Sequence, residues 1–356
     1  MALSFHEIKI AEIIERTQDC VSVVFDIPTS LEESFQFLPG QYLTLEKTIN
    51  GEEVRRSYSL CSAPGDHRWE VAIKKVPGGK FSSYANDVLQ PGDKIQLGTP
   101  EGRFLLKEPS EGKDTYVFFA AGSGITPVMS MIRHLLTETD HDVVLFYGNR
   151  TTDSIIFREE LEDLKSKNMN QFTLHHILSK EKLGSPLFYG RIDAKKCESY
   201  LKHLVNDDVV IQYSICGPGQ MIFEVKDALV ASGVEEDKVN FELFTTADMK
   251  KTTQEVEEVI EDASALVKIR LDGLITEFTV PFGGKAILDA ALESGADLPF
   301  SCKGGVCCTC RAKLLEGEVK MDVNYALEPD EVEQGFILTC QSHPRSEVLE
   351  IDFDEA

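Results

Sequence analysis

Hydrophobic and polar residues alternate in short runs through the first 108 residues, the period expected of half-buried β-strands. Six runs predict strands, at 8–14, 21–27, 42–45, 54–60, 69–76 and 94–97. Asn50-Gly51 lies between two of them and is a strong signal for a tight hairpin turn. One helix is expected at roughly 81–89. This part of the chain therefore predicts a small antiparallel β-barrel.

The pattern changes after residue 112, where apolar runs alternate with segments of helical period. Strands are expected at 116–121, 143–147, 172–177, 209–215 and 239–243. Helices are expected between them, at 128–137, 157–167, 194–203 and 220–232. Strands that alternate with helices are typical of an α/β domain with a doubly wound parallel sheet.

The last third of the chain begins after a polar, charged stretch at 246–262 that lacks aromatic residues and is interpreted as a linker. Residues 263–356 open with a hairpin around Asp272-Gly273 and continue with a helix near 286–294 and a cysteine-rich loop. We therefore expect four parts: a barrel at 1–108, an α/β domain at 109–245, the linker at 246–262, and a small α+β domain at 263–356.

Composition narrows the class of protein. The chain has 356 residues, of which 42% are hydrophobic, so a normal core can be buried. No apolar run approaches the roughly 20 residues that span a bilayer, and the charged start does not resemble a signal peptide. A cytoplasmic protein without a membrane partner is expected.

The net charge of −24 argues against nucleic acid as a partner, because non-specific binding to phosphates requires excess Lys and Arg. The acidic residues are densest at the end of the chain, where residues 263–356 hold 17 acidic and 8 basic residues. Such a surface can serve solubility alone, or it can dock a basic partner.

Five of the nine cysteines cluster late in the chain. Cys302, Cys307 and Cys310 have the spacing C-x4-C-x2-C, and Cys340 follows at a distance. This spacing is typical of plant-type [2Fe–2S] sites, whereas zinc sites usually combine two short cysteine pairs. Buried free cysteines are a third reading, but cysteines rarely crowd in this way for packing alone. Gly304 and Gly305 are expected to take positive φ, so that backbone N–H groups approach the sulfurs. Cys308 does not fit the spacing and is expected to point away from the metal.

Two segments of the barrel can hold a flavin. Arg56-Ser57-Tyr58-Ser59 ends a strand and offers a cation for phosphates, an aromatic plate and hydroxyl groups, although plain cross-strand pairing also explains it. Gly79-Lys80-Phe81-Ser82 opens the predicted helix, and a helix N-terminus is a ready phosphate site. The alternative for the second segment is a simple glycine turn with Ser82 as N-cap.

A dinucleotide turn is expected after the first strand of the parallel sheet. There, Gly122-Ser-Gly124 precedes Thr126, the expected N-cap, and Pro127, the expected first helical residue. Cys216-Gly217-Pro218 ends a later strand and can close the same crevice, although an ordinary strand-to-helix turn has the same pattern.

Two further features of this domain bear on the nicotinamide. Glu242 and Phe244 lie at the end of the last strand, where a carboxylate and an aromatic ring can border the flavin. Arg150 follows the second strand, where an acidic residue would suit the ribose of NADH. An Arg there can pair with a 2′-phosphate, which favours NADPH, unless the side chain is merely solvated.

Together these motifs resemble the ferredoxin–NADP reductase superfamily, and the cysteine loop resembles a plant-type ferredoxin. The order flavin, nicotinamide, iron–sulfur is shared with several oxygenase reductases. The likeness extends to the reductase subunits of phenylacetyl-CoA epoxidases in Tyr147-Gly-Asn-Arg-Thr, Gly190-Arg-Ile-Asp and Asn324-Tyr-Ala-Leu-Glu-Pro-Asp-Glu. The second residue of the Cys307-Cys308 doublet departs from the small residue expected there.

The resemblance implies FAD, a six-stranded barrel and a β-grasp [2Fe–2S] module. It also implies that Ser59 binds flavin N5 and that Cys216 and Glu242 border nicotinamide C4, which makes these three the candidate catalytic residues. The expected function is electron transfer from NADPH through FAD and the cluster to an oxygenase, a phenylacetyl-CoA epoxidase-type diiron enzyme and hence a step in phenylacetate catabolism. Two alternatives stay open: a general reductase that serves many acceptors, and a non-enzymatic iron–sulfur redox sensor.

Overall fold

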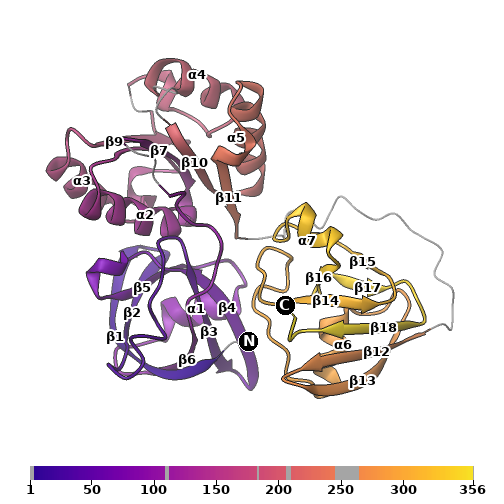
Figure 1. The fold of residues 1–356 in the computed structure, drawn as a ribbon. Coiled ribbons are helices and arrows are strands. Elements are labelled where there is room, and N and C mark those ends of the chain that lie inside the picture. Colours follow the sequence, from indigo (N-terminus) through magenta and orange to yellow (C-terminus); the bar gives the residue numbers. More distant parts are fainter. Residues whose placement is uncertain (1–3, 109–111, 183, 206–209, 245–263, 356) are drawn as a thin grey trace. The chain divides into compact units, whose positions relative to one another are not determined.

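A computed structural model describes residues 4–108, 112–182, 184–205, 210–244 and 264–355, so the predicted linker lies outside the described residues. The chain divides into two compact units, Phe5–Phe244 and Thr245–Ala356 together with Met1–Ser4. Figure 1 shows the first unit as a β-sheet domain followed by an α/β domain, and the second as a small mixed domain. Among the helices that the structure describes, none combines the length and the apolar character needed to cross a membrane.

The first domain is a six-stranded antiparallel sheet with the strand order β4-β3-β6-β1-β2-β5. The strands are β1 (Phe5–Thr17), β2 (Cys20–Asp26), β3 (Tyr42–Ile49), β4 (Glu52–Ser59), β5 (Trp69–Lys74) and β6 (Lys94–Gly98), with the helix α1 (Lys80–Asp87). All six strands and the helix were predicted. Asn50 and Gly51 both have positive φ, 54° and 80°, which confirms the tight β3–β4 hairpin.

The second domain is a five-stranded parallel sheet with the order β11-β10-β7-β8-β9, covered by helices as Figure 1 shows. Its strands are β7 (Thr115–Ala121), β8 (Asp142–Asn149), β9 (Phe172–Leu178), β10 (Val210–Gly217) and β11 (Val239–Leu243). Its helices are α2 (Ile125–Glu138), α3 (Arg158–Lys167), α4 (Ala194–Leu204) and α5 (Gly219–Ala231). From β7 the next strands are added on one side of the sheet, and from β10 on the other, so the strand order switches between β7 and β10. An open α/β sheet forms its ligand crevice at such a switch point.

One apolar cluster joins these two domains. It combines Cys20, Cys61 and Ala72 of the barrel with residues of the parallel sheet and of α2, such as Phe118 and Ile132. These five residues are all at most 5% exposed. Because this core is continuous, the two domains form one compact body.

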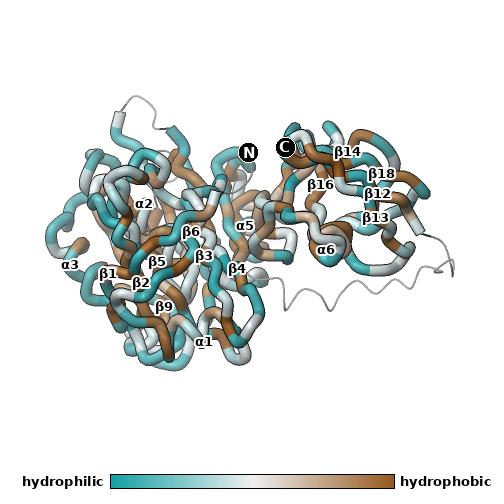
Figure 2. The backbone as a smooth tube through the Cα atoms, turned by 90° about the horizontal axis from the view of Figure 1, so that it is seen from below, coloured by the Kyte–Doolittle hydropathy of each residue, from teal (hydrophilic) through white to brown (hydrophobic). Residues whose placement is uncertain are grey.

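The C-terminal unit has a five-stranded sheet with the order β13-β12-β18-β14-β16 and a two-stranded sheet β15-β17. Its elements are β12 (Ser264–Leu271), β13 (Leu274–Pro281), α6 (Ile287–Glu293), β14 (Arg311–Glu316), β15 (Val319–Met321), α7 (Pro329–Glu333), β16 (Phe336–Leu338), β17 (Ser342–Pro344) and β18 (Val348–Asp352). The predicted hairpin at Asp272-Gly273 is confirmed, with φ of 51° and 72°. Figure 2 shows hydrophobic and hydrophilic residues alternating along the chain of this unit, as half-buried strands require.

Candidate functional site

The three candidate catalytic residues come together at the boundary between the barrel and the parallel sheet. Ser59 ends β4, and its Oγ donates to Glu242 Oε2 at 3.4 Å, across 183 positions of sequence. Cys216 on β10 lies directly beside Glu242 on β11 in the parallel register. The structure thus places a hydroxyl, a carboxyl and a thiol from two domains in one neighbourhood.

Burial sets the protonation of two of these groups. Glu242 is half-buried, and protein surrounds its carboxyl group closely enough that burial raises its pKa to about 8, although the hydrogen bond from Ser59 opposes the shift. Cys216 is fully buried, and burial together with the nearby Glu242 carboxyl raises its thiol pKa well above the ordinary value. At neutral pH this site therefore holds a neutral thiol and a largely protonated carboxyl group.

The glycine turn after β7 lies against the end of β10. A Cβ on Gly124 would lie 2.2 Å from the backbone oxygen of Cys216, so only glycine permits this approach of the α2 start to the strand. Gly217 is less strictly required, because a Cβ there would meet the movable end of the Met221 side chain at 2.7 Å and the backbone nitrogen of Ala121 only at 3.2 Å. Gly122 has a left-handed φ of 55°, and its carbonyl accepts a hydrogen bond from Tyr147 Oη at 3.0 Å.

The predicted cap of α2 is wrong by two residues. The helix begins at Ile125 with Gly124 as its N-cap, directly after a 3-10 turn at Gly122–Gly124. Thr126 is buried inside the first turn, and its Oγ1 donates to the Ser123 carbonyl at 3.1 Å. Pro127 is still tolerated, because the first N–H groups of a helix have no intrahelical partner. The free N–H groups therefore begin earlier, closer to β7.

The first flavin segment presents two kinds of side chain along β4. Arg56 is exposed, whereas Tyr58 is half-buried, with its ring centroid 5.6 Å from that of Phe81 at the start of α1. Ser57 lies opposite Thr44, with their hydroxyl oxygens 3.3 Å apart. The Tyr58–Phe81 contact brings the two predicted flavin segments side by side.

The second segment offers backbone groups more than side chains. Gly79 is the N-cap of α1, and the Ser82 hydroxyl, expected as the alternative N-cap, accepts from the Val76 N–H at 3.1 Å. Phe81 is 1% exposed and belongs to the barrel core, and Lys80 is exposed and pairs with Glu52. The N–H groups of the first helical turn have no intrahelical acceptor, so they are the groups that can meet a phosphate.

The remaining predicted residues surround the same end of the parallel sheet. Arg150 is exposed just past β8, and Pro218 is the N-cap of α5. Phe244 follows β11 and packs against the apolar cluster shared by the two domains. These positions agree with a ligand crevice at the carboxyl ends of the strands.

The four cysteines predicted to bind metal form two pairs in the C-terminal unit. Cys302 and Cys307 have their sulfurs 3.1 Å apart, and Cys310 is hydrogen-bonded to Cys340. Within each pair one sulfur accepts a hydrogen bond from the partner's thiol. This bond, with backbone N–H groups, lowers the Cys302 pKa to about 6, and a bond from Cys310 lowers the pKa of Cys340.

The pairing fits a binuclear cluster better than a single zinc ion. A [2Fe–2S] cluster takes two protein ligands per iron, and two separate sulfur pairs provide that arrangement.

Backbone groups of the loop also face the sulfurs. The Gly304 N–H donates to Cys302 Sγ at 3.3 Å, and the Gln341 side chain lies 3.5 Å from Cys340 Sγ. Positive φ occurs at Lys303 and Gly305 (50° and 73°), so the expectation for Gly304 was wrong and Lys303 takes the second left-handed position.

Cys308 is half-buried, and its thiol donates to the Ala326 carbonyl at 3.2 Å. Cys302 and Cys307 contact each other through their sulfurs, whereas the thiol of Cys308 contacts a backbone carbonyl instead. This contact accords with the expectation that Cys308 is not a ligand.

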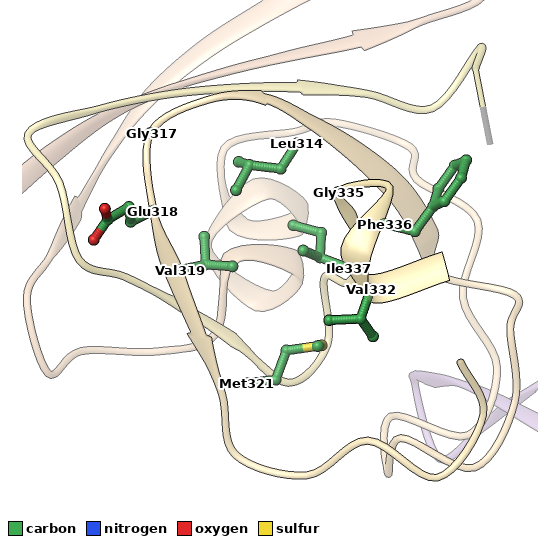
Figure 3. A pocket seen from close by; sticks show the side chains of 9 residues that line it. All are labelled: Leu314, Gly317, Glu318, Val319, Met321, Val332, Gly335, Phe336 and Ile337. Atoms are coloured by element: carbon green, nitrogen blue, oxygen red, sulfur yellow. The ribbon is translucent and has the colours of Figure 1, made fainter. Parts of the chain in front are cut away.

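An apolar pocket of about 310 Å³ also lies in the C-terminal unit, between β14, β15, α7 and β16 (Figure 3). Its lining residues are Leu314, Gly317, Glu318, Val319, Met321, Val332, Gly335, Phe336 and Ile337. None of them is a predicted site residue, and Glu318 is the one charged member of the lining. The pocket is therefore separate from the flavin, nicotinamide and cysteine positions.

Sequence reasoning missed a group of charged residues at the boundary between the barrel and the parallel-sheet domain. Arg16, Glu70, Arg133 and Glu160 connect the two domains by ion pairs. They are far apart in the sequence and belong to no motif, so no local signal could have found them.

Comparisons with known proteins agree with this geometry. Family models match for the oxidoreductase FAD-binding domain at residues 7–105, the oxidoreductase NAD-binding domain at 118–227 and the 2Fe-2S iron-sulfur cluster binding domain at 269–345. The chain is 39% identical to one of the subunits of the 1,2-phenylacetyl-CoA epoxidase of Escherichia coli, over 99% of this chain and 98% of that protein.

Two further relatives show the same full-length match. The ferredoxin reductase component of 3-ketosteroid-9-alpha-monooxygenase of Mycolicibacterium smegmatis is 34% identical over 98% of this chain and 97% of that one. The structure of phthalate dioxygenase reductase is 25% identical, with a TM-score of 0.62 and 98% of both chains covered. The chain therefore belongs to the ferredoxin–NADP reductase superfamily, in the group of FAD- and NAD-binding oxidoreductases that carry a C-terminal [2Fe–2S] ferredoxin domain.

Proposed function

We propose that this protein is the NADPH-dependent reductase of an oxygenase, of the kind that serves phenylacetyl-CoA epoxidase, a diiron enzyme. The observation that carries the proposal is the sequence identity of 39% to a component of such an epoxidase, over 99% of this chain. The Ser59–Glu242 hydrogen bond and the paired cysteines support it. The other relatives named above are also reductase components, of a monooxygenase and a dioxygenase. A cytoplasmic location is part of the proposal.

The roles of the residues follow from their positions. A bound flavin would supply the chemistry that couples two-electron hydride transfer to single-electron transfer. Ser59 would hydrogen-bond the flavin and orient Glu242, to which its hydroxyl already donates. Cys216 would line the nicotinamide site as a neutral thiol, because its pKa lies well above the ordinary value.

Cofactor contacts outside the hydride site are assigned in the same way. The N–H groups at the start of α1, with Arg56 of β4, would hold the flavin phosphates, and Tyr58 would face the ring. The turn at Gly122–Gly124 would hold the dinucleotide pyrophosphate. Arg150, exposed beyond β8, would pair with the 2′-phosphate, which supports NADPH over NADH.

The division of labour can be tested by removing the cluster domain. The proposed boundaries are 1–108 for the flavin domain, 109–245 for the nicotinamide domain, 246–262 for the linker and 263–356 for the ferredoxin domain. A chain truncated after Thr246 should stay yellow, oxidise NADPH and reduce ferricyanide, because Phe5–Phe244 is a compact unit. Electron delivery to the epoxidase should collapse.

The control for this experiment is the separate ferredoxin domain added back in solution. It should restore part of the rate, because a short tether provides an effective concentration of order mM that mixing does not. If the truncated chain fed the oxygenase as well as the full chain, electrons would not leave through the cluster. Fast turnover with many unrelated acceptors and slow turnover with the epoxidase would instead indicate a general reductase.

A further inference from the structure

A series of alternating charges crosses the boundary between the barrel and the parallel-sheet domain. Arg16, near the end of β1, donates through Nη2 to Glu70 of β5 at 2.6 Å and through Nη1 to Glu160 of α3 at 2.5 Å. Its Nε donates to Ser22 Oγ of β2 at 2.7 Å. Every nitrogen of this guanidinium is engaged, and the three acceptors come from three different elements.

The boundary is crossed a second time from α2. Arg133 Nη1 lies 3.5 Å from Asp66 of the barrel, and within its own domain Arg133 donates to the other oxygen of Glu160 at 2.5 Å. One turn earlier, Ser130 Oγ donates to the Ser62 carbonyl of the barrel at 2.6 Å. Glu160 thus joins two arginines, one from each domain, and both α2 and α3 are held against the barrel.

The centre of this network is buried. The side chains of Arg16 and Glu70 are 12% and 5% exposed. A buried ion pair contributes little net stability, because desolvation offsets the attraction between the charges, but its fixed hydrogen bonds can specify one geometry. Removal of one partner leaves a buried charge unpaired and also lowers stability, so the effect of this network on domain placement needs a readout other than the free energy of unfolding.

The start of α3 shows that its placement is specified. Phe157, the N-cap of α3, is buried and has a left-handed φ of 60°. This conformation is unfavourable for a bulky side chain and persists only where the surroundings hold it. The Arg16 guanidinium lies over the Phe157 ring, 5.0 Å from its centroid. Arg16 therefore contacts both the ring at the N-cap and the carboxylate in the first turn.

Both helices that the network holds lead to the proposed dinucleotide site. The helix α2 begins directly after the turn at Gly122–Gly124, and α3 follows the loop that starts at Arg150. The hydrogen bond between Ser59 and Glu242 crosses the same boundary. Any slip between the domains would change the distance between hydride donor and acceptor, and a misplacement of about 1 Å can lower a rate about a hundredfold.

We propose that Arg16 and Glu160, supported by Glu70 and Arg133, are positioning residues that set the nicotinamide domain on the flavin domain for hydride transfer. The proposal rests on the proposed transfer from NADPH to the flavin. These four residues touch neither cofactor in this assignment, and they act through the placement of α2 and α3.

The test compares Glu160→Ala with Glu162→Ala in the full-length holoprotein. Glu162 is the matched control, since it lies on the same helix in an exposed pair with Arg158. In Glu160→Ala each arginine keeps one carboxylate, Glu70 or Asp66, so the fold should survive. At saturating NADPH, the rate constant of flavin reduction should fall about tenfold or more, while the NADPH dissociation constant changes less than about twofold. Glu162→Ala should match the wild type in both.

A second readout does not depend on turnover. Amide hydrogen exchange at residues 157–161 and 61–66 should be about tenfold faster in Glu160→Ala and unchanged in Glu162→Ala. Arg16→Lys should behave like Glu160→Ala, because an ammonium cannot reproduce the planar fork that engages three acceptors. A wild-type reduction rate in both variants, or a loss confined to NADPH affinity or melting temperature, would overturn the proposal.

The exchange experiment also separates this proposal from the proposed function. If the wild type reduced its flavin with neither NADPH nor NADH, the proposed function would fail on that result alone. Unchanged exchange at both segments in Glu160→Ala would show that the ion pairs do not hold the boundary, whatever the wild type does with nicotinamides.

Discussion

The cysteine site and the hydride site draw their residues from very different distances along the chain. Cys302, Cys307 and Cys310 belong to one loop, and Cys340 follows within the same small unit. Ser59 and Glu242, by contrast, are 183 positions apart and belong to two domains. The first site depends mainly on the conformation of a loop, whereas the second depends on how two domains pack.

This difference has a consequence for robustness. The cysteine loop should keep its geometry whenever the C-terminal unit is folded, whatever the other domains do. Its sulfurs are held by nearby backbone groups such as the Gly304 N–H. Under the proposals above, the hydride site would need the shared apolar cluster and the ion pairs of Arg16 to hold the two domains in place. Four changes test this comparison, from the largest expected effect to the smallest.

The largest effect should follow from replacing a predicted cluster ligand. Cys302→Ser, Cys307→Ser, Cys310→Ser and Cys340→Ser should each abolish the cluster, because two irons need all four thiolates. Cys308→Ser is the matched control and should keep about two irons and two acid-labile sulfides per chain. Flavin reduction by NADPH should survive in all five variants, since the two sites form independently. Stoichiometric zinc without sulfide would contradict the assignment.

A smaller effect is expected at the proposed dinucleotide site, on the binding of NADPH. If Arg150 pairs with the 2′-phosphate, Arg150→Ala should weaken NADPH binding by about 1.5–3 kcal/mol and leave NADH nearly unchanged. Titration of each nucleotide measures the two dissociation constants. Arg158→Ala, which removes another exposed arginine of the same domain, is the control. Equal losses for NADPH and NADH would remove Arg150 from this role.

The acidic C-terminal unit should make electron delivery depend on salt. Exposed charges are screened beyond a Debye length of about 10 Å at 0.1 M ionic strength, so delivery to the oxygenase should slow as salt rises. Transfer from NADPH to the flavin, followed with ferricyanide, should respond differently because it does not use the acidic surface. A rate with the oxygenase that is independent of salt would leave solubility as the role of these acidic residues.

The smallest effect concerns the protonation of Glu242. Its pKa is raised to about 8 in the folded protein, so the folded state binds this proton more tightly than the unfolded state does. The resulting stability is fully present below about 4.5, the ordinary pKa, and is lost as pH rises through about 8. As pH rises from about 4.5 to about 8, the melting temperature of the wild type should therefore fall relative to that of Glu242→Gln. Parallel profiles for the two proteins would show that the carboxyl is not perturbed.

Much of this protein was predictable from local sequence. Asn50-Gly51 and Asp272-Gly273 take the left-handed conformations that tight hairpins require, because these residue types tolerate positive φ. The period of apolar residues located every strand of the first two sheets. The cysteine spacing predicted a [2Fe–2S] site, and the family model for a 2Fe-2S cluster binding domain matches residues 269–345, which include all four predicted ligands. Even there the residue with positive φ was Lys303 and not Gly304, since the loop's contacts, and not glycine alone, select the conformation.

Only the tertiary structure decided which residues of different domains contact each other. Periodicity reports which face of a strand is buried but not its neighbour across a domain boundary, so the Ser59–Glu242 hydrogen bond and the ion pairs of Arg16 had no local signal. Packing also decided that Phe81 fills the barrel core and that Gly124 admits the backbone of Cys216. The reason is physical: turns and periods depend on the sterics of a few adjacent residues, whereas contacts between distant residues exist only once the whole core has formed.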